Sequence, residues 1–165
     1  MHRLIVAPKG DSTADRRGAA AVEFALVAPV FVALVIGAIQ AGFNLDSTTK
    51  MYAAIRQSGR LASLDYDSKL LPNQSINAKI IQDIKNSLTA EGLPGDKMSV
   101  SITYADGAKE GSSFDLGDPN NDLLNFRIGV AVNYSDVNSK SVLPSNMNSL
   151  NASVVFRKGR SALVE

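Results

Sequence analysis

Residues 16–43 read RRGAAAVEFALVAPVFVALVIGAIQAGF, and the rest of the chain is organised around this segment. An arginine pair and a glycine are followed by small apolar residues. From Phe24 to Phe43 no side chain carries a formal charge. An α-helix of about 20 residues rises roughly 30 Å, which is the thickness of the hydrocarbon core of a bilayer. The segment therefore predicts a transmembrane helix over residues 19–43.

The charges that flank this helix predict its orientation. Residues 1–18 hold four basic and two acidic side chains, a net charge of +2, and Arg16 and Arg17 stand directly before the helix. Short flanks rich in lysine and arginine stay in the cytoplasm. We therefore expect a single-pass protein with a cytoplasmic N-terminus. The helix is expected to continue outside the membrane over residues 44–64.

Three other interpretations of the apolar segment compete with this one. A cleaved secretory signal has an apolar region of about 7–15 residues, which is shorter than the run seen here. A soluble domain rarely needs about 20 uncharged residues in a row for a buried helix. A plain signal anchor fits the hydropathy, but it does not account for Gly18 after the arginines or for Glu23 inside the helix. A carboxylate at membrane depth costs about 2.5–3.5 kcal/mol on insertion scales, unless it reaches the interface.

The string RRGAAAVEFALVAPVF resembles the N-terminus of TadE-like pseudopilins. These proteins are minor pilins of the tight-adherence (Tad or Flp) branch of type IV pili. The resemblance is strong over residues 16–43 and weaker over residues 44–64. Beyond residue 64 only the general layout of a pilin is similar.

The resemblance assigns roles to residues at the start of the helix. In the family a prepilin peptidase cuts after the glycine, which here places the cleavage between Gly18 and Ala19. Glu23 then becomes the fifth residue of the mature chain, and Phe24 follows it as in the family. These two residues are the assembly residues that the resemblance implies. Residues 1–18 become a cytoplasmic leader whose charge comes from the arginine pair, Arg16 and Arg17.

The resemblance also implies a function and a set of partners. It implies a minor pilin or pseudopilin in the bacterial inner membrane that contributes to the assembly or initiation of an adhesive Tad pilus. Its partners would be the prepilin peptidase, other Tad pilins and pseudopilins, the inner-membrane Tad platform and ATPase complex, and membrane lipid. No enzymatic activity and no cofactor are implied. The alternative is a single-pass envelope domain that binds a ligand and joins no filament; a membrane-anchored hydrolase is the weakest hypothesis.

Three features of the helix bear on how such subunits would pack. Cleavage would leave an ammonium group on Ala19, and the same group of a neighbouring subunit could pair with Glu23 in a medium of low dielectric constant. Pro29 lacks an N–H group, so we expect it to kink or loosen the helix. Gly37 and Gly42 permit close approach of helices, although glycine is also simply common in membrane helices.

The chain after the apolar segment predicts two further helical stretches. Helical spacing predicts a stripe on the first helix, formed by Leu45, Tyr52, Ile55, Gly59 and Ala62. The polar residues 46–49 could interrupt that helix, because their side chains compete for backbone hydrogen bonds. Residues 65–73 are expected to form a linker. The four-residue apolar repeat then predicts an amphipathic helix over residues 76–90, with Ser75 as N-cap and Gly92 and Pro94 as the stop.

The period of the apolar pattern then changes from helical to two. Alternation predicts strands over residues 98–104, 124–134 and 150–157. The connections, residues 105–122 and 135–149, are polar and contain glycine or proline. The predicted fold is therefore α+β and pilin-like: a long N-terminal transmembrane helix, a second amphipathic helix and a small antiparallel three-stranded sheet. Residues 65–165 would form the globular pilin domain.

The composition excludes several kinds of chemistry. The net charge is +1, which gives no basic excess for binding nucleic acid. The chain has no cysteine, and its one histidine is His2, inside the predicted leader. The acidic loop 115–122 begins like a calcium-binding loop at Asp118. Its sixth and twelfth positions lack the usual glycine and glutamate, so a solvated turn is the expected structure and no metal site is predicted.

Overall fold

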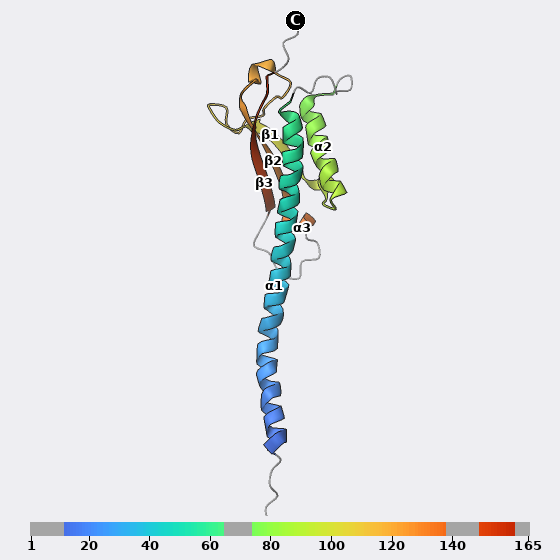
Figure 1. The fold of residues 1–165 in the computed structure, drawn as a ribbon, viewed down its shortest axis with the longest axis vertical. Helices are drawn as coiled ribbons and strands as arrows, with labels where there is room; N and C mark the ends of the chain where they lie inside the picture. Colours follow the sequence, from blue (N-terminus) through green and yellow to red (C-terminus); the bar gives the residue numbers. More distant parts are fainter. Residues whose placement is uncertain (1–11, 65–73, 138–148, 161–165) are drawn as a thin grey trace, which may run out of the picture. The chain divides into compact units, whose positions relative to one another are not determined.

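The computed structural model describes residues 12–64, 74–137 and 149–160, with side chains described from residue 18 onward. The chain divides into two compact units, residues 1–40 and 41–165. The predicted linker 65–73 and most of the predicted leader lie outside the described residues. The elements in chain order are α1 (Ser12–Ala62), α2 (Ile76–Ala90), η2 (Gly95–Lys97), β1 (Ser99–Tyr104), η3 (Pro119–Asn121), β2 (Asn125–Asn133), α3 (Tyr134–Val137) and β3 (Ser149–Arg157) (Figure 1).

Helix α1 is longer than predicted at its start and is not interrupted near residue 46. It begins at Ser12, so the last part of the leader is helical. The expected continuation of the helix beyond residue 43 is confirmed, and the polar residues 46–49 do not interrupt it. The hydroxyls of Thr48 and Thr49 donate to the carbonyls four residues earlier, at 2.8 and 2.7 Å. Asp46 forms an ion pair with Lys50 at 2.7 Å. These polar side chains find partners within the helix instead of competing with it.

The face of α1 that packs in the second unit differs from the predicted stripe. Leu45 was expected on this face, but 70% of its surface is exposed. Ile55, Gly59 and Ala62 are buried as predicted, and Tyr52 is half-buried. The remaining buried positions are small or polar residues and a methionine, namely Ser47, Met51, Ala54 and Ser58. A sequence pattern of large apolar residues does not indicate a helix face that packs closely through serine and alanine.

Helix α2 confirms the sequence prediction at both ends. The Ser75 hydroxyl accepts a hydrogen bond from the N–H of Ala78 at 3.1 Å, which caps the first turn. Gly92 has a φ of 84° and follows the C-cap residue. The N–H of Leu93 donates to Leu88 at 2.9 Å, and that of Gly92 donates to Thr89 at 3.0 Å, which is the Schellman arrangement. The buried residues of α2 are those of the predicted stripe: Ile76, Ile80, Ile84 and Leu88.

The sheet is antiparallel, with strand order β1-β2-β3. Ser99 lies opposite Ala131 on β2, and Asn125 lies opposite Arg157 on β3. The second strand is shorter than predicted at both ends. Leu124 precedes it with 42% of its surface exposed, and Tyr134 begins the short helix α3.

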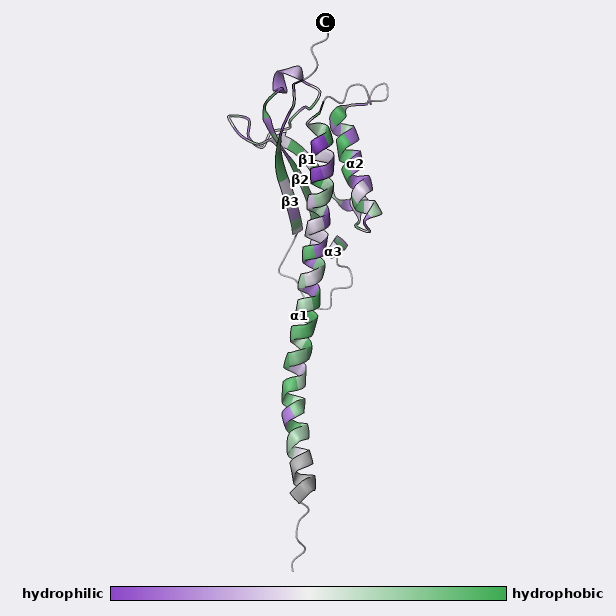
Figure 2. Cartoon of the chain, in the orientation of Figure 1, coloured by the Kyte–Doolittle hydropathy of each residue, from purple (hydrophilic) through white to green (hydrophobic). Residues whose placement is uncertain are grey.

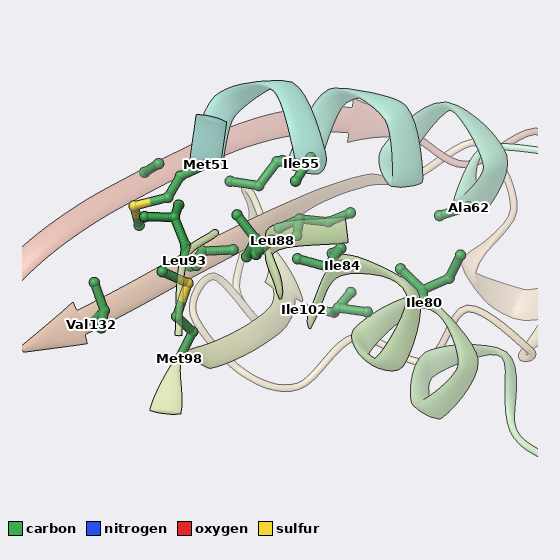
Figure 3. Packing of buried hydrophobic residues seen from close by; sticks show 14 of the residues in the cluster. Met51, Ile55, Ala62, Ile80, Ile84, Leu88, Leu93, Met98, Ile102 and Val132 are labelled. Atoms are coloured by element: carbon green, nitrogen blue, oxygen red, sulfur yellow. The ribbon is translucent and has the colours of Figure 1, made fainter. Parts of the chain in front are cut away.

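One hydrophobic core joins the last part of α1, helix α2 and the sheet (Figure 3). Aromatic rings make a continuous row through it. The ring centroids of Tyr104 and Phe114 are 4.7 Å apart, those of Phe114 and Phe126 are 5.3 Å apart, and those of Phe126 and Phe156 are 5.7 Å apart. These separations are within the favourable range for aromatic pairs.

The row of rings ends against α1 at Gly59. A Cβ atom placed on Gly59 would lie 2.2 Å from the Phe156 ring, a distance that the two groups cannot share. Glycine at this position therefore allows α1 to approach β3 closely. Gly42, on the same helix, has no heavy atom within 4 Å of such a Cβ.

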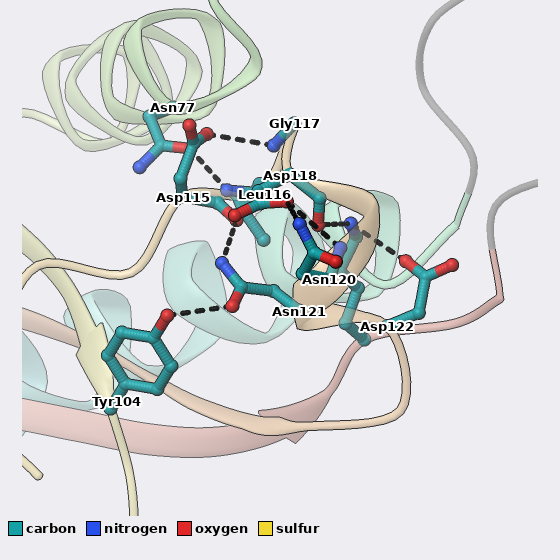
Figure 4. A network of polar contacts seen from close by, with 10 residues as sticks. Asn77, Tyr104, Asp115, Leu116, Gly117, Asp118, Asn120, Asn121 and Asp122 are labelled. Atoms are coloured by element: carbon teal, nitrogen blue, oxygen red, sulfur yellow. Dashed lines mark hydrogen bonds and ion pairs between the residues drawn. The ribbon is translucent and has the colours of Figure 1, made fainter. Parts of the chain in front are cut away.

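A buried lysine fixes the loop between β1 and β2 to the chain beyond β3. Only 9% of the Lys158 side chain is exposed, and its Nζ atom lies 2.9 Å from the Asp122 carboxylate. It also donates to the Asp118 carbonyl at 2.8 Å. Asn121, in the same loop, accepts from the Tyr104 hydroxyl at 2.7 Å and donates to the Asp115 carbonyl at 2.8 Å (Figure 4). The loop is thus held both by Tyr104 at the end of β1 and by Lys158, which follows β3.

The first prediction concerns the close approach at Gly59. Gly59→Ala should lower the free energy of unfolding by about 1–3 kcal/mol, since the added methyl group forces the Phe156 ring to move. Gly42→Ala is the matched control and should leave stability unchanged or raise it by up to about 1 kcal/mol. Circular dichroism of the full chain in detergent micelles during thermal unfolding measures both. Equal effects of the two substitutions would contradict this packing.

The second prediction concerns the buried ion pair. Lys158→Met should cost about 3–5 kcal/mol, because it leaves the carboxylate of Asp122 largely buried without this cation. Lys79→Met on α2 removes a partly exposed ion pair with Asp83 and should cost no more than about 0.5 kcal/mol. The same unfolding measurement compares the two variants. A loss for Lys158→Met as small as that of the control would show that the lysine does not hold the loop.

Candidate functional site

The apolar part of α1 is long enough to cross a membrane. From Gly18 onward the helix contains a window with a mean hydropathy of 2.5, and none of that window is buried within the protein. Figure 2 shows hydrophobic residues around this part of α1, whereas α2 carries a mixed surface. It is the one helix among the described residues with this length and composition. The prediction of one long N-terminal apolar helix is confirmed.

The side chains of this part of α1 lie open on its surface. Phe24 is 73% exposed and Leu26 is 72% exposed. Ten other large apolar residues from Val22 to Leu45 are also at least 42% exposed: Val22, Val27, Val30, Phe31, Val32, Leu34, Val35, Ile39, Phe43 and Leu45. A soluble monomer rarely exposes so large a continuous apolar surface. The helix therefore requires a covering of lipid or of other polypeptides.

The predicted cleavage position lies within the helix. Gly18 and Ala19 are exposed, and no heavy atom lies within 4 Å of a Cβ placed on Gly18. Because α1 begins at Ser12, the bond between the two residues has helical backbone on both sides. The nitrogen of Ala19 is a neutral peptide nitrogen in this chain and becomes a cation only if that bond is cut. The side chains of Arg16 and Arg17 lie outside the described ones.

The structure brings the predicted assembly residues to the beginning of the apolar segment. Glu23 is exposed and follows Ala19 by four residues, so the two lie on the same face of α1. Glu23 takes part in none of the ion pairs between the described side chains. Its neighbour Phe24 is among the most exposed aromatic residues of the helix. The site is a single carboxylate on an otherwise apolar surface.

The helix passes through Pro29 without ending. Proline leaves the carbonyl of Ala25 without its usual helical partner. The expected kink at this residue stays a prediction. Gly37 and Gly42 have no heavy atom within 4 Å of a Cβ position, so both leave room for another helix to approach.

The acidic loop uses its polar groups within the protein. Asp118 caps η3, and one of its carboxylate oxygens accepts from the backbone N–H of Asn120 at 2.9 Å. An Asp115 oxygen accepts from the N–H of Gly117 at 2.9 Å. Asn77 on α2 donates to the Phe114 carbonyl and accepts from the N–H of Leu116 (Figure 4). Within the described ranges no group of three or more His, Cys, Asp or Glu residues could hold a metal ion.

Sequence reasoning missed Lys158 and Asn77 as residues that organise this loop. Lys158 is far from Asp122 in sequence, and a lysine after a strand gives no local sign of burial. Asn77 lies on the polar side of a helix, where an asparagine is unremarkable. Nothing short of the tertiary contacts could have identified either residue.

Comparison with known proteins agrees with the geometry of α1. Residues 18–60 match the family described as TadE-like protein. The match begins at the predicted cleavage position, covers the exposed apolar part of α1 and ends within the same helix. TadE-like proteins are in general not enzymes. The chain matches no curated protein and no solved structure. Residues 18–60 of this chain are thus similar to TadE-like proteins, a family of pilin-like proteins of Tad systems, and among the described residues the chain has one apolar helix, near the N-terminus, that is long enough for membrane anchoring.

Proposed function

We propose that the protein is a minor pilin, or pseudopilin, that contributes to the assembly or initiation of a Tad-type adhesive pilus after cleavage by a prepilin peptidase. The observation that carries the proposal is the exposed apolar helix with one carboxylate, Glu23, placed one turn after Ala19. Such a surface is suited to bind lipid before assembly and other apolar helices afterwards.

The size of the second unit supports the minor role. Residues 41–165 form a unit with their own hydrophobic core. Major pilins of this branch resemble only the leader and the helix and are much shorter. A folded domain of this size is therefore more suited to initiating or modifying a filament than to forming its bulk.

The division of the chain follows from this proposal. Residues 1–18 are the cytoplasmic leader, residues 19–43 cross the inner membrane, and residues 44–64 continue the helix on the extracytoplasmic side. Residues 65–165 supply the rest of the α+β domain. Because the second compact unit begins at Ala41, residues 44–64 fold together with that domain rather than acting as a spacer.

Cleavage would change the electrostatics of the helix start. The peptidase removes the basic leader and leaves a cationic nitrogen on Ala19. The bond lies within a helix, so it must unwind locally, and glycine at position 18 reduces the helical preference there by about 1 kcal/mol relative to alanine. Gly18 also presents no side chain to the enzyme.

The free ammonium group gives Glu23 a partner in assembly. A carboxylate on a lipid-facing helix is unfavourable, and pairing it with a cation removes most of that penalty. In a bundle of such helices, the Ala19 ammonium of one subunit pairs with Glu23 of its neighbour and sets their relative height. The partners in this process are other Tad pilins and pseudopilins, together with the inner-membrane platform and ATPase complex.

The third prediction concerns processing. Gly18→Leu should leave the precursor uncut, since the leucine side chain fills the place where the peptidase requires glycine. N-terminal sequencing of the membrane-extracted protein would show a mature chain starting at Ala19 in the wild type and an intact leader in the variant. A wild-type chain that keeps its leader in cells with an active peptidase would instead favour an anchored envelope domain.

The fourth prediction concerns assembly. Glu23→Gln should be cleaved normally, yet its amount in pilus complexes should fall at least about ten-fold, as the loss of about 1.4 kcal/mol of coupling would give. Asp46→Asn is the matched control, because Asp46 is a carboxylate on the same helix beyond the apolar segment. Immunoblots of sheared pili and of membranes measure the ratio. Normal incorporation of Glu23→Gln would refute the role of the carboxylate.

A further inference from the structure

One edge of the sheet, strand β3, has no partner strand among the described residues. The hydrogen-bonding positions can be assigned from two bonds at the end of the sheet. Lys158 donates to the Leu124 carbonyl at 3.0 Å, and Ala105 donates to the Asn125 carbonyl at 3.1 Å.

These two bonds determine which residues face outward. In an antiparallel pair, residues that exchange hydrogen bonds alternate with residues that do not. Residues 152, 154 and 156 therefore bond to β2, and the N–H and C=O groups of Asn151, Ser153 and Val155 point away from the sheet. The side chains of these three residues are also exposed. None of the described residues bonds to these groups. The edge therefore presents a row of backbone donors and acceptors to the solvent.

The opposite edge of the same sheet is covered over residues 102–104 of β1. The N–H of Gly111 donates to the Tyr104 carbonyl, and the N–H of Tyr104 donates to the Ser112 carbonyl, both at 3.0 Å. Phe114 donates to the Ile102 carbonyl at 3.0 Å. The outward groups of β1 at residues 102 and 104 are thus used by the loop that follows the strand.

Strand β3 also lacks the features that usually prevent pairing of edges. Its nine residues, SLNASVVFR, contain no proline, and the one charge is Arg157 at the end. Natural edge strands are commonly protected by charges, proline, bulges or short length. A long, regular edge without them is a surface to which another strand can add.

We propose that the β3 edge binds an extended segment of a different polypeptide, which becomes the fourth strand of the sheet. A second copy of this chain fits poorly. Antiparallel pairing of β3 with β3 needs a two-fold axis that reverses the whole second unit, including residues 41–62 of α1, which pack in the same core. The two copies would then leave the membrane in opposite directions, which does not fit two subunits anchored in one membrane; this step rests on the proposed function. Parallel pairing would join the apolar face of one sheet to the polar face of the other. Pairing along the whole of β1 is blocked, because the segment 111–114 occupies its edge at residues 102–104.

The side chains of β3 define the chemistry of the added strand. Val154 and Phe156 face the core but are only half-buried at the edge, so the residues beside them should be apolar. Ser153 and Asn151 face the other side, where polar residues fit. Arg157 is exposed and favours an acidic residue near the end of the added strand. The partner segment therefore alternates between apolar and polar residues and carries an acidic residue.

Hydrogen exchange at single amides tests the proposal with the full chain. In the isolated protein in detergent micelles, the amides of residues 151, 153 and 155 should exchange at least about 100-fold faster than those of 152, 154 and 156. In complexes extracted from assembling cells, the first set should slow by a similar factor. Fast exchange of that set in the complexes, or slow exchange in the isolated chain, would overturn the proposal.

Two variants at residue 153 distinguish the effect of losing the backbone N–H group from the effect of changing the side chain. Ser153→Pro removes one edge N–H without removing a bond to β2, whereas Ser153→Ala keeps it. Both should fold with the wild-type melting temperature within a few degrees, and only the proline variant should lose the slow exchange at residues 151 and 155. Equal behaviour of the two variants would contradict strand addition. Failure of the proposed function would appear differently, as an uncut N-terminus. If the protein is cleaved and assembled but the edge amides still exchange rapidly, this inference alone is refuted.

Discussion

The apolar side chains of α1 have no covering within the protein, and this constraint governs how the rest of the chain works. Of the sixteen large apolar side chains that are exposed in the described part of the chain, twelve lie from Val22 to Leu45 on one helix. Removing apolar surface from water contributes roughly 25 cal/mol per Å², so the helix gains much by entering lipid or contacting other apolar helices. A chain with this surface is stable only as part of a membrane or an assembly. The match of residues 18–60 to TadE-like proteins agrees with that requirement.

The same helix then serves as a structural element of a folded domain. Beyond Leu45 its buried positions are mostly small: Ser47, Ala54, Ser58, Gly59 and Ala62. Small residues let the sheet approach closely, and at Gly59 the Phe156 ring occupies the space of the missing side chain. The end of the helix is therefore fixed by the core that α2 and the sheet complete. One helix thus meets two different environments, and the change in its side chains near residue 46 marks the transition.

Local signals predicted much of this structure. The four-residue repeat of isoleucine and leucine located α2, and alternation located all three strands, because each pattern reflects one nearby face. The errors in predicted burial arose where distant contacts decide. Leu45 and Leu124 are apolar but exposed, since none of the described elements buries them. The hydrogen bonds of Thr48 and Thr49 kept α1 continuous where polar residues suggested a break. The sequence indicated which residues form the candidate site. Only the structure showed that these residues are exposed on a helix that the rest of the protein does not cover.

Because the chain contains no cysteine, single cysteines can report directly on the environment of α1. The most direct measurement compares Leu34→Cys with Thr49→Cys in intact membranes, using a maleimide that cannot cross the bilayer. Both side chains are exposed in the isolated chain. The account predicts rapid labelling at residue 49 from the extracytoplasmic side and none at residue 34 until the membrane is dissolved and assemblies are dissociated. Equal labelling at the two positions in intact membranes would contradict it.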